Sequence, residues 1–119
     1  MKLNHLDLQV ADVRATAALF QSLFGLRLQS NSSSSSIAIL GDDDGFVLVL
    51  QRLKSAAETY PSGFHLGFTL ESVDTVHDVQ ARARALQLDV SDVIENNRGT
   101  MVYCRMPDGY LVEVSSPPR

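Results

Sequence analysis

The chain has 119 residues and a mass of 13.0 kDa, the size of a single domain, which excludes most multidomain enzymes. Hydrophobic residues make up 45% of it and charged residues 20%, so it can build a folded core. A net charge of −4 without any basic stretch argues against nucleic acid or an anionic membrane as a partner. No apolar stretch approaches the roughly 18 residues of a membrane span, and Cys104 is the single cysteine, so we expect a cytoplasmic protein.

The first half of the sequence predicts one strand, one helix and three further strands. Residues 3–10 alternate polar and apolar side chains, the period of a half-buried strand. Asp12 is a suitable N-cap for a helix over 13–24, and Gly25 stands where a helix ends. The serine tract 31–36 is typical of a hairpin tip. The three further strands are expected at 26–30, 37–40 and 46–50.

The same order of elements begins again after residue 62. A strand at 64–70 precedes a helix over 73–86 that Ser72 can cap. When His5 is placed on His65, the apolar positions of the two halves coincide at a constant offset of 60, which becomes 64 near the end of each half. Three further strands are expected at 90–94, 100–105 and 110–114.

The chain is therefore predicted to be a tandem repeat of two βαβββ modules, 1–53 and 63–119, joined by the linker 54–62. This predicts an α+β fold. One module alone buries little surface, so we expect both to form a single domain with one curved mixed sheet. The helices should lie outside, and the opposite face of the sheet should enclose a cleft.

Strand parity predicts which side chains enter that cleft. The alternate residues of the first strand of each half are apolar and face the helices, so His5 and His65 should point the other way. Glu113 should do the same from the last strand. Two imidazoles and one carboxylate on a concave face form a set that can hold a divalent metal and leave coordination positions open.

Four segments carry a resemblance to a known family: HLDLQVAD at 5–12, LFGLRL at 23–28, HLGF at 65–68 and PDGYLVE at 107–113. Together they resemble the vicinal oxygen chelate superfamily. That group includes glyoxalase I, extradiol dioxygenases, fosfomycin-resistance transferases, methylmalonyl-CoA epimerase and bleomycin-resistance proteins. The resemblance covers nearly the whole chain and implies the glyoxalase-like fold.

The resemblance also implies a chemistry. The metal-ligand positions of the superfamily match His5, His65 and Glu113, and Glu113 is also the expected catalytic residue. The implied cofactor is a divalent ion such as Fe, Mn, Ni or Zn, which chelates two neighbouring oxygens of a small organic substrate. A glyoxalase I-like lyase, an isomerase or an extradiol dioxygenase-like metalloenzyme would each fit.

Some residues depart from the pattern of these enzymes. Glyoxalase I-like enzymes carry a fourth ligand where this chain has Val49, which cannot ligate a metal. Gln51 lies on the same strand face and is either a weak substitute ligand or a residue of the cleft rim. Extradiol cleavage would need a further histidine, but His77 is predicted on a solvated helix face.

The predicted walls of the cleft are mainly apolar, with a few polar groups at the rim, which suits a small oxygenated molecule with a hydrophobic body. Tyr103 matches a tyrosine position of the fosfomycin-resistance enzymes, and a role in strand packing is the alternative. The expected substrate-binding residues are Val49, Gln51, Arg98, Met101 and Tyr103.

Two questions stay open at this point. The first is whether the chain is such an enzyme or a metal-free binding protein of the bleomycin-resistance kind, which sequesters a small molecule. The second is assembly: a half-sheet with an exposed edge favours pairing, so we expect a homodimer in which His5 of one chain shares its site with His65 and Glu113 of the other.

Overall fold

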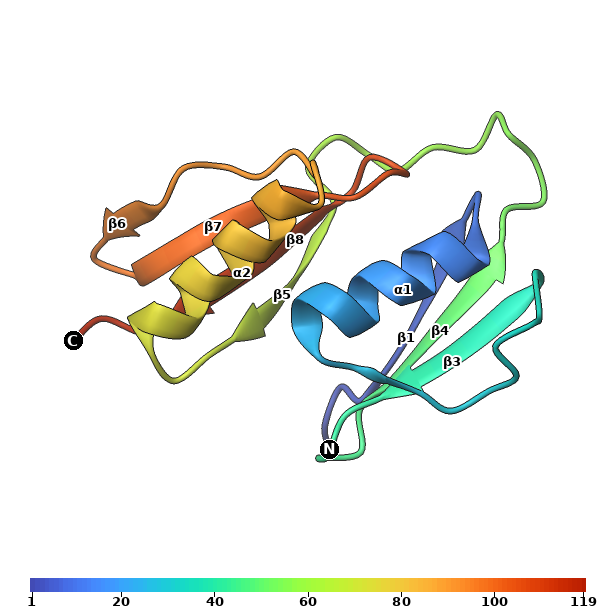
Figure 1. Cartoon of the computed structure of the whole chain (residues 1–119), viewed down its shortest axis with the longest axis horizontal. Coiled ribbons are helices and arrows are strands. Elements are labelled where there is room, and N and C mark those ends of the chain that lie inside the picture. The colour runs from blue at the N-terminus through green and yellow to red at the C-terminus, as the bar shows by residue number, and fades with distance from the viewer. The chain divides into compact units, whose positions relative to one another are not determined.

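A strand, a helix and three strands follow one another in each half of the molecule (Figure 1). The computed structural model describes residues 1–119 and divides them into two units, 1–58 and 59–119. The first unit contains β1 (His5–Val10), α1 (Val13–Phe24), β2 (Arg27–Leu28), β3 (Ile37–Gly41) and β4 (Val47–Arg52). The second contains β5 (His65–Thr69), α2 (Val73–Ala85), β6 (Ile94–Asn96), β7 (Gly99–Arg105) and β8 (Leu111–Ser116).

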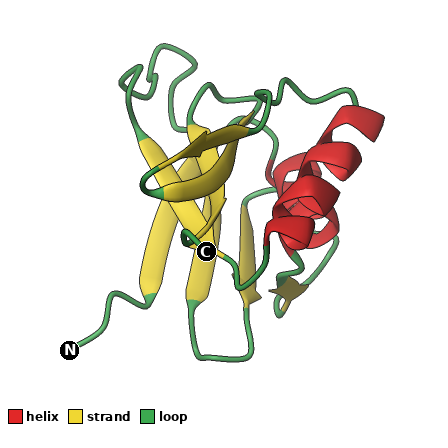
Figure 2. Cartoon of the chain, turned by 90° about the vertical axis from the view of Figure 1, so that its left-hand side faces the viewer, coloured by secondary structure: helices red, strands yellow, loops and turns green.

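Both four-stranded sheets are mixed and have the same topology. The first has the order β1-β4-β3-β2 and the second the order β5-β8-β7-β6. The first strand of each unit runs parallel to the last, and the remaining neighbours are antiparallel. The parallel pairs arise because a helix carries the chain back across the sheet. Strands and helices are distinguished by colour in Figure 2. The predicted α+β fold with two βαβββ modules is confirmed.

Helix α1 has the predicted bounds because both ends are capped. The Asp12 carboxylate accepts a hydrogen bond from the Ala15 backbone N–H at 3.0 Å. At the other end Gly25 adopts a φ of 71°, a left-handed conformation that costs glycine little. The apolar side of the helix is buried and consists of Val13, Thr16, Ala17, Phe20 and Leu23.

Helix α2 ends one residue earlier than predicted. Ser72 caps its start as expected, but Leu86 is the C-cap and is half exposed, so it is not a core position. The chain turns away because Gln87 takes a φ of 60° and the Leu88 N–H bonds the Ala83 carbonyl at 3.0 Å. None of the helices is long and apolar enough to cross a membrane.

Two of the expected strands are shorter or displaced. The strand predicted at 26–30 is reduced to Arg27–Leu28, and the one predicted at 90–94 is found at Ile94–Asn96. Val90 makes only an isolated bridge with Cys104. Both segments lie at the outer edge of their sheet, where one neighbour is missing and side chains decide less about pairing.

Each helix covers one face of its own sheet. Helix α1 contacts β3 and β4, and α2 contacts β7 and β8. The side chains between helix and sheet are buried, including Leu8, Leu48 and Leu50 in the first unit and Val102, Val112 and Val114 in the second. The alternate residues of these strands therefore lie on the face opposite the helix, where the expected functional residues are found.

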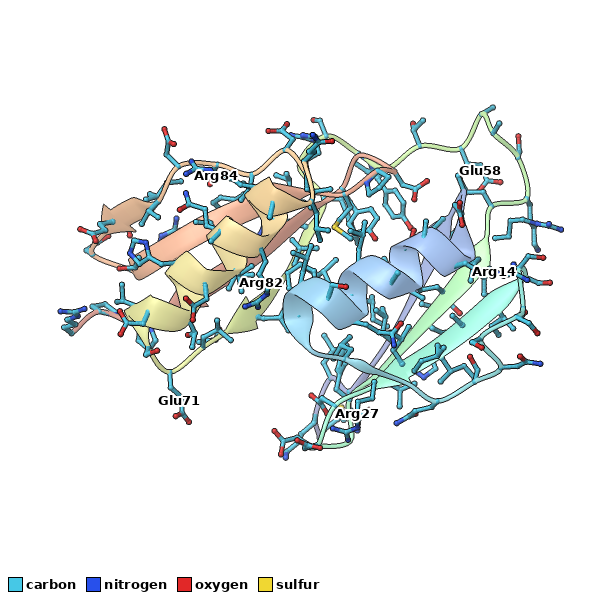
Figure 3. All side chains as sticks on the ribbon, viewed as in Figure 1. Arg14, Arg27, Glu58, Glu71, Arg82 and Arg84 are labelled. Atoms are coloured by element: carbon cyan, nitrogen blue, oxygen red, sulfur yellow. The ribbon has the colours of Figure 1, made fainter.

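Exposed ion pairs join neighbouring segments within each unit, and two of the arginines involved, Arg27 and Arg84, are labelled in Figure 3. Arg27 of β2 pairs with Asp43 of the β3–β4 turn at 2.6 Å. Arg84 of α2 pairs with Asp92, in the segment that leads to β6, at 3.1 Å. These contacts lie at the periphery of the units, away from the sheet faces that carry the candidate site.

Candidate functional site

In the second unit, three neighbouring strands bring expected site residues onto one sheet face. Gly67 of β5, Glu113 of β8 and Tyr103 of β7 are Cα partners in one row across the sheet. His65 stands two residues before Gly67 on the same side of β5. The His65 and Tyr103 rings meet edge to face with centroids 6.3 Å apart. The structure thus gathers His65, Tyr103 and Glu113 into one polar cluster.

The backbone fixes the tautomer of His65. Its Nδ1 lies 3.1 Å from the Gly63 carbonyl oxygen. Because a carbonyl only accepts hydrogen bonds, Nδ1 must carry the proton, and in the neutral ring Nε2 then keeps a free lone pair. Metal-ligating histidines show this arrangement, with one ring nitrogen bonded to a carbonyl and the other turned to the metal.

Glu113 is held by the tyrosine next to it. The Tyr103 hydroxyl donates to Glu113 Oε1 at 2.5 Å. Gly67 lies directly against Glu113, since a Cβ at position 67 would be 3.2 Å from the Glu113 carbonyl oxygen and 3.5 Å from both Cβ and Oε2. The Tyr103 hydroxyl therefore fixes Oε1 of Glu113, and Oε2 lies against β5 at Gly67, which has no side chain.

The surroundings keep the Tyr103 hydroxyl protonated. The hydrogen bond to Glu113 raises the pKa of Tyr103, and burial and the negative charge of Glu113 raise it further. Arg98, in the turn between β6 and β7, acts in the opposite direction. The sulfur of Met101 lies 3.7 Å from the hydroxyl oxygen. Arg98 and Met101, two of the expected substrate-binding residues, therefore both interact with the hydroxyl group of a third, Tyr103.

The corresponding face of the first unit carries His5, Val49 and Gln51, as predicted. Asp7 of β1, Val49 of β4 and Ile39 of β3 form the equivalent row. Gln51 does not stand alone there, because its side-chain amide donates to Asp7 Oδ2 at 2.6 Å. The other carboxylate oxygen, Oδ1, accepts from Gln9 at 2.8 Å.

Asp7 was not among the expected site residues, although its place on the polar side of β1 could be read from the alternation of residues 3–10. Two other polar residues lie outside the cluster. Arg105 bonds the Gly109 carbonyl at 2.8 Å and is committed to the β7–β8 turn. His77 is exposed on α2, as predicted.

The donor atoms suit a divalent ion, although the structure gathers no group of three His, Cys, Asp or Glu side chains that could hold one. The second unit offers an imidazole Nε2 and a carboxylate, both of which are oriented by hydrogen bonds from outside the ligand set. Two such donors are fewer than the three protein ligands that a divalent-metal site usually has.

Comparison with known families and structures agrees with this architecture. The sequence profile of the Glyoxalase/Bleomycin resistance protein/Dioxygenase superfamily matches residues 2–114. A possible glyoxalase from Bacillus cereus is 30% identical, with a TM-score of 0.83 and coverage of 97% of this chain and 98% of that one. No significant match is found among curated proteins.

Two more distant structures share the fold. The fosfomycin resistance protein FosX from Listeria monocytogenes, solved with Mn(II) and sulfate, is 23% identical with a TM-score of 0.78, and 98% of this chain aligns with 90% of it. Lactoylglutathione lyase from Agrobacterium tumefaciens is 21% identical with a TM-score of 0.75, with coverage of 97% and 92%. This chain belongs to the glyoxalase/bleomycin resistance protein/dioxygenase superfamily.

Proposed function

We propose that the protein is a divalent-metal-dependent enzyme that acts on a small oxygenated organic molecule, as a lyase, isomerase or dioxygenase. His5, His65 and Glu113 are the proposed metal ligands, with Fe, Mn, Ni or Zn as the ion. When bound, the ion would act as a Lewis acid on neighbouring oxygens of the substrate.

The observation that carries this proposal is the orientation of His65 beside Glu113. The Gly63 carbonyl accepts a hydrogen bond from the protonated Nδ1 of His65, which leaves Nε2 unprotonated in the neutral ring, and Tyr103 fixes one oxygen of Glu113. A histidine that served only as a polar surface residue would not need its tautomer set next to an oriented carboxylate. A structural neighbour of the same fold was solved with Mn(II), which supports a metal in this fold.

The remaining proposed roles concern the substrate. The Tyr103 hydroxyl, which stays protonated beside Glu113, can donate a hydrogen bond to a substrate oxygen. The Glu113 carboxylate is the proposed group that accepts a proton from the substrate and returns it. Arg98 would attract an anionic or polar part of the substrate, and Met101 and Val49 would contact its apolar body. Gln51 would contribute an amide from the first unit.

Metal content tests the proposal. The protein purified without chelators should retain a transition metal or bind Mn²⁺ on titration, and His65→Ala and Glu113→Gln should each weaken that binding by about tenfold or more. His77→Ala is the matched control, because His77 is exposed on α2 and should have no effect. If no divalent metal binds under any loading condition, the proposed enzyme is wrong.

One observation favours the second candidate, a metal-free binding protein of the bleomycin-resistance kind. The hydrogen bond from Tyr103 already satisfies one oxygen of Glu113 without any ion, and Val49 cannot ligate. Such a protein would bind small molecules in the absence of metal. A ligand screen by mass spectrometry on chelator-treated protein distinguishes the candidates, since undiminished binding after metal removal supports the second.

We also propose that the protein forms a symmetric homodimer with sites shared between chains. In each sheet the first strand, β1 or β5, lies at an edge, and an edge strand offers unpaired backbone groups to another strand. Co-refolding His5→Ala with Glu113→Ala tests the sharing. Shared sites should regain metal binding in part of the mixed dimers, whereas sites within one chain cannot be restored. A monomeric mass at high micromolar concentration would contradict the dimer.

A further inference from the structure

The turn before β5 contains the carbonyl group that orients His65. Residues 61–64 form a β-turn in which the Phe64 N–H donates to the Pro61 carbonyl at 3.0 Å. That N–H belongs to the same peptide group as the Gly63 carbonyl, which lies 3.1 Å from His65 Nδ1. Because the peptide group is planar and trans, its N–H and C=O point in opposite directions. The hydrogen bond to Pro61 therefore also sets the direction of the Gly63 carbonyl.

Aromatic packing holds this turn against the second unit. The Phe64 ring lies against the Tyr60 ring with centroids 5.1 Å apart, and the Tyr60 ring lies 5.0 Å from that of Tyr110. Phe64 and Tyr110 meet edge to face at 6.4 Å, which completes a triangle of three rings. These separations are typical of favourable aromatic pairs. Tyr110 is fully buried, so the triangle joins the turn to the core of its unit.

Tyr60 is the ring that precedes the turn. Residues 61–63 between the rings are exposed, and a Cβ at position 63 would meet nothing within 4 Å, so no side chain packs against the turn at Gly63. After the turn, the Phe64 carbonyl accepts a hydrogen bond from the Leu111 N–H at 3.2 Å. The turn is thus held at its end by β8 and at its start by the Tyr60 ring.

We infer that Tyr60 is a positioning residue for His65, which keeps the Gly63 carbonyl directed at Nδ1 and so leaves the lone pair of Nε2 free. This inference rests on the proposed function, because Nε2 is the atom proposed to bind the metal. Tyr60 acts through the backbone of the turn and is not a catalytic residue. Groups that orient a metal-ligating histidine through its other ring nitrogen affect the affinity for the metal without touching it.

The tautomer of His65 tests this inference without metal or activity. In ¹⁵N NMR spectra of chelator-treated protein at about pH 8.5, where a typical imidazole is neutral, we expect His65 to be protonated mainly at Nδ1. His65→Gln assigns the signal. In Tyr60→Ala the carbonyl is no longer held, so the excess of the Nδ1–H tautomer should be lost.

Two variants control for other effects of the substitution. Tyr60→Phe keeps the ring and should keep the tautomer of the unmodified protein. Val76→Ala truncates a fully buried residue of α2 and controls for loss of stability alone, so it should also keep the tautomer. If Tyr60→Ala does not fold, Tyr60→Leu, which retains an apolar side chain without a ring, should show the same loss of the Nδ1–H excess.

Mn²⁺ titration measures the consequence for the proposed site. Tyr60→Ala should bind Mn²⁺ about three- to tenfold more weakly, and Tyr60→Phe as tightly as the unmodified protein. An unchanged His65 tautomer in the folded Tyr60 variant would overturn the inference, as would the same loss in Tyr60→Phe or Val76→Ala. If the unmodified protein binds no Mn²⁺, the proposed function fails, whereas the tautomer measurement still decides whether Tyr60 positions His65.

Discussion

The two halves of the chain share a backbone and differ in the residues placed on it. At equivalent rows, Asp7 and Val49 of the first half stand where Gly67 and Glu113 stand in the second. A Cβ at position 67 would lie 3.2 Å from the Glu113 carbonyl oxygen, a tight contact, and 3.5 Å from Cβ and Oε2 of Glu113, an ordinary van der Waals distance. The carboxylate thus stands on the last strand in the second half and on the first strand in the first half.

The helices differ in a second way. Phe20 of α1 and Gln80 of α2 occupy equivalent positions at the offset of 60, and both are buried. Phe20 packs against Phe24 with ring centroids 5.4 Å apart, whereas Gln80 donates to the Ser91 carbonyl at 3.0 Å. The repeat therefore preserves which helix positions are buried. The buried side chain is stabilised by apolar packing in α1 and by a hydrogen bond in α2.

Alanine substitutions of Phe20 and Gln80 should produce the largest difference between the halves in the free energy of unfolding. Phe20→Ala removes a fully buried ring and should lower the free energy of unfolding by about 3–5 kcal/mol. Gln80→Ala removes one hydrogen bond and leaves the Ser91 carbonyl to find water, a loss of about 1–2 kcal/mol. Urea denaturation followed by circular dichroism measures both, and equal losses would contradict the comparison.

Alkaline pH should destabilise the second half, because the first 58 residues contain neither Tyr nor Cys. Burial raises the pKa of the Cys104 thiol from 9.0 to about 11 and also raises the pKa of Tyr110. Since the folded thiol holds its proton more tightly, its contribution is complete below pH 9 and is lost as the pH rises towards 11. The loss is roughly 3 kcal/mol.

Urea denaturation at pH 8 and at pH 10.5 measures this effect. Cys104→Val keeps an apolar side chain of similar size and removes the thiol, so it should reduce the loss of stability at high pH. A loss that is identical with and without the thiol would assign the alkaline effect to Tyr110 or to another group.

Substitutions at Gly67 and Asp7, which occupy equivalent rows of the two sheets, should have a smaller effect on stability. Gly67→Val would place a Cβ 3.2 Å from the Glu113 carbonyl oxygen and add methyl groups beside the carboxylate, so it should cost about 1–2 kcal/mol, together with a change in Tyr103 absorbance as its hydrogen bond is disturbed. Asp7→Val, at the equivalent place, has only the exposed contacts with Gln9 and Gln51 to lose. Thermal unfolding should therefore separate the two variants, and a larger loss for Asp7→Val would reverse the interpretation.

The smallest effects are expected at the exposed ion pairs. Arg27→Ala in the first half and Arg84→Ala in the second should each change the free energy of unfolding by less than about 1 kcal/mol, since both pairs are solvated. Added salt should shrink the difference further. A large effect at either position would show that the ion pair has a role beyond the surface.

Local signals in the sequence were reliable where they act within a few residues. The Asp12 cap and Gly25 stop predicted both ends of α1, and the offset of 60 predicted that both halves have the same order of elements. The same signals failed at Leu86 and Val90, because a left-handed Gln87 and a missing sheet neighbour changed the course of the chain there. Such features depend on the surroundings of a segment more than on its composition.

The candidate site, too, could be predicted from the sequence only in part. Alternation along the strands was enough to place His5, His65 and Glu113 on the face opposite the helices. It was not enough to find the Gly63 carbonyl that sets the tautomer of His65 or the hydrogen bond from Tyr103 to Glu113. These contacts join residues on different strands or in a turn, so they depend on register and on rotamers that only the folded chain fixes.

The βαβββ repeat and the faces of the strands could be predicted from the amino-acid sequence, because periodicity, caps and turn glycines act locally and need no partner strand. The superfamily followed from the resemblance of four short motifs. Which residues are neighbours across a row depends on the folded sheet: the hydrogen bond between Gln51 and Asp7 joins β4 to β1 across 44 positions of the chain. Contacts of that kind are set by the pairing of distant strands, which a pattern of neighbouring residues does not encode.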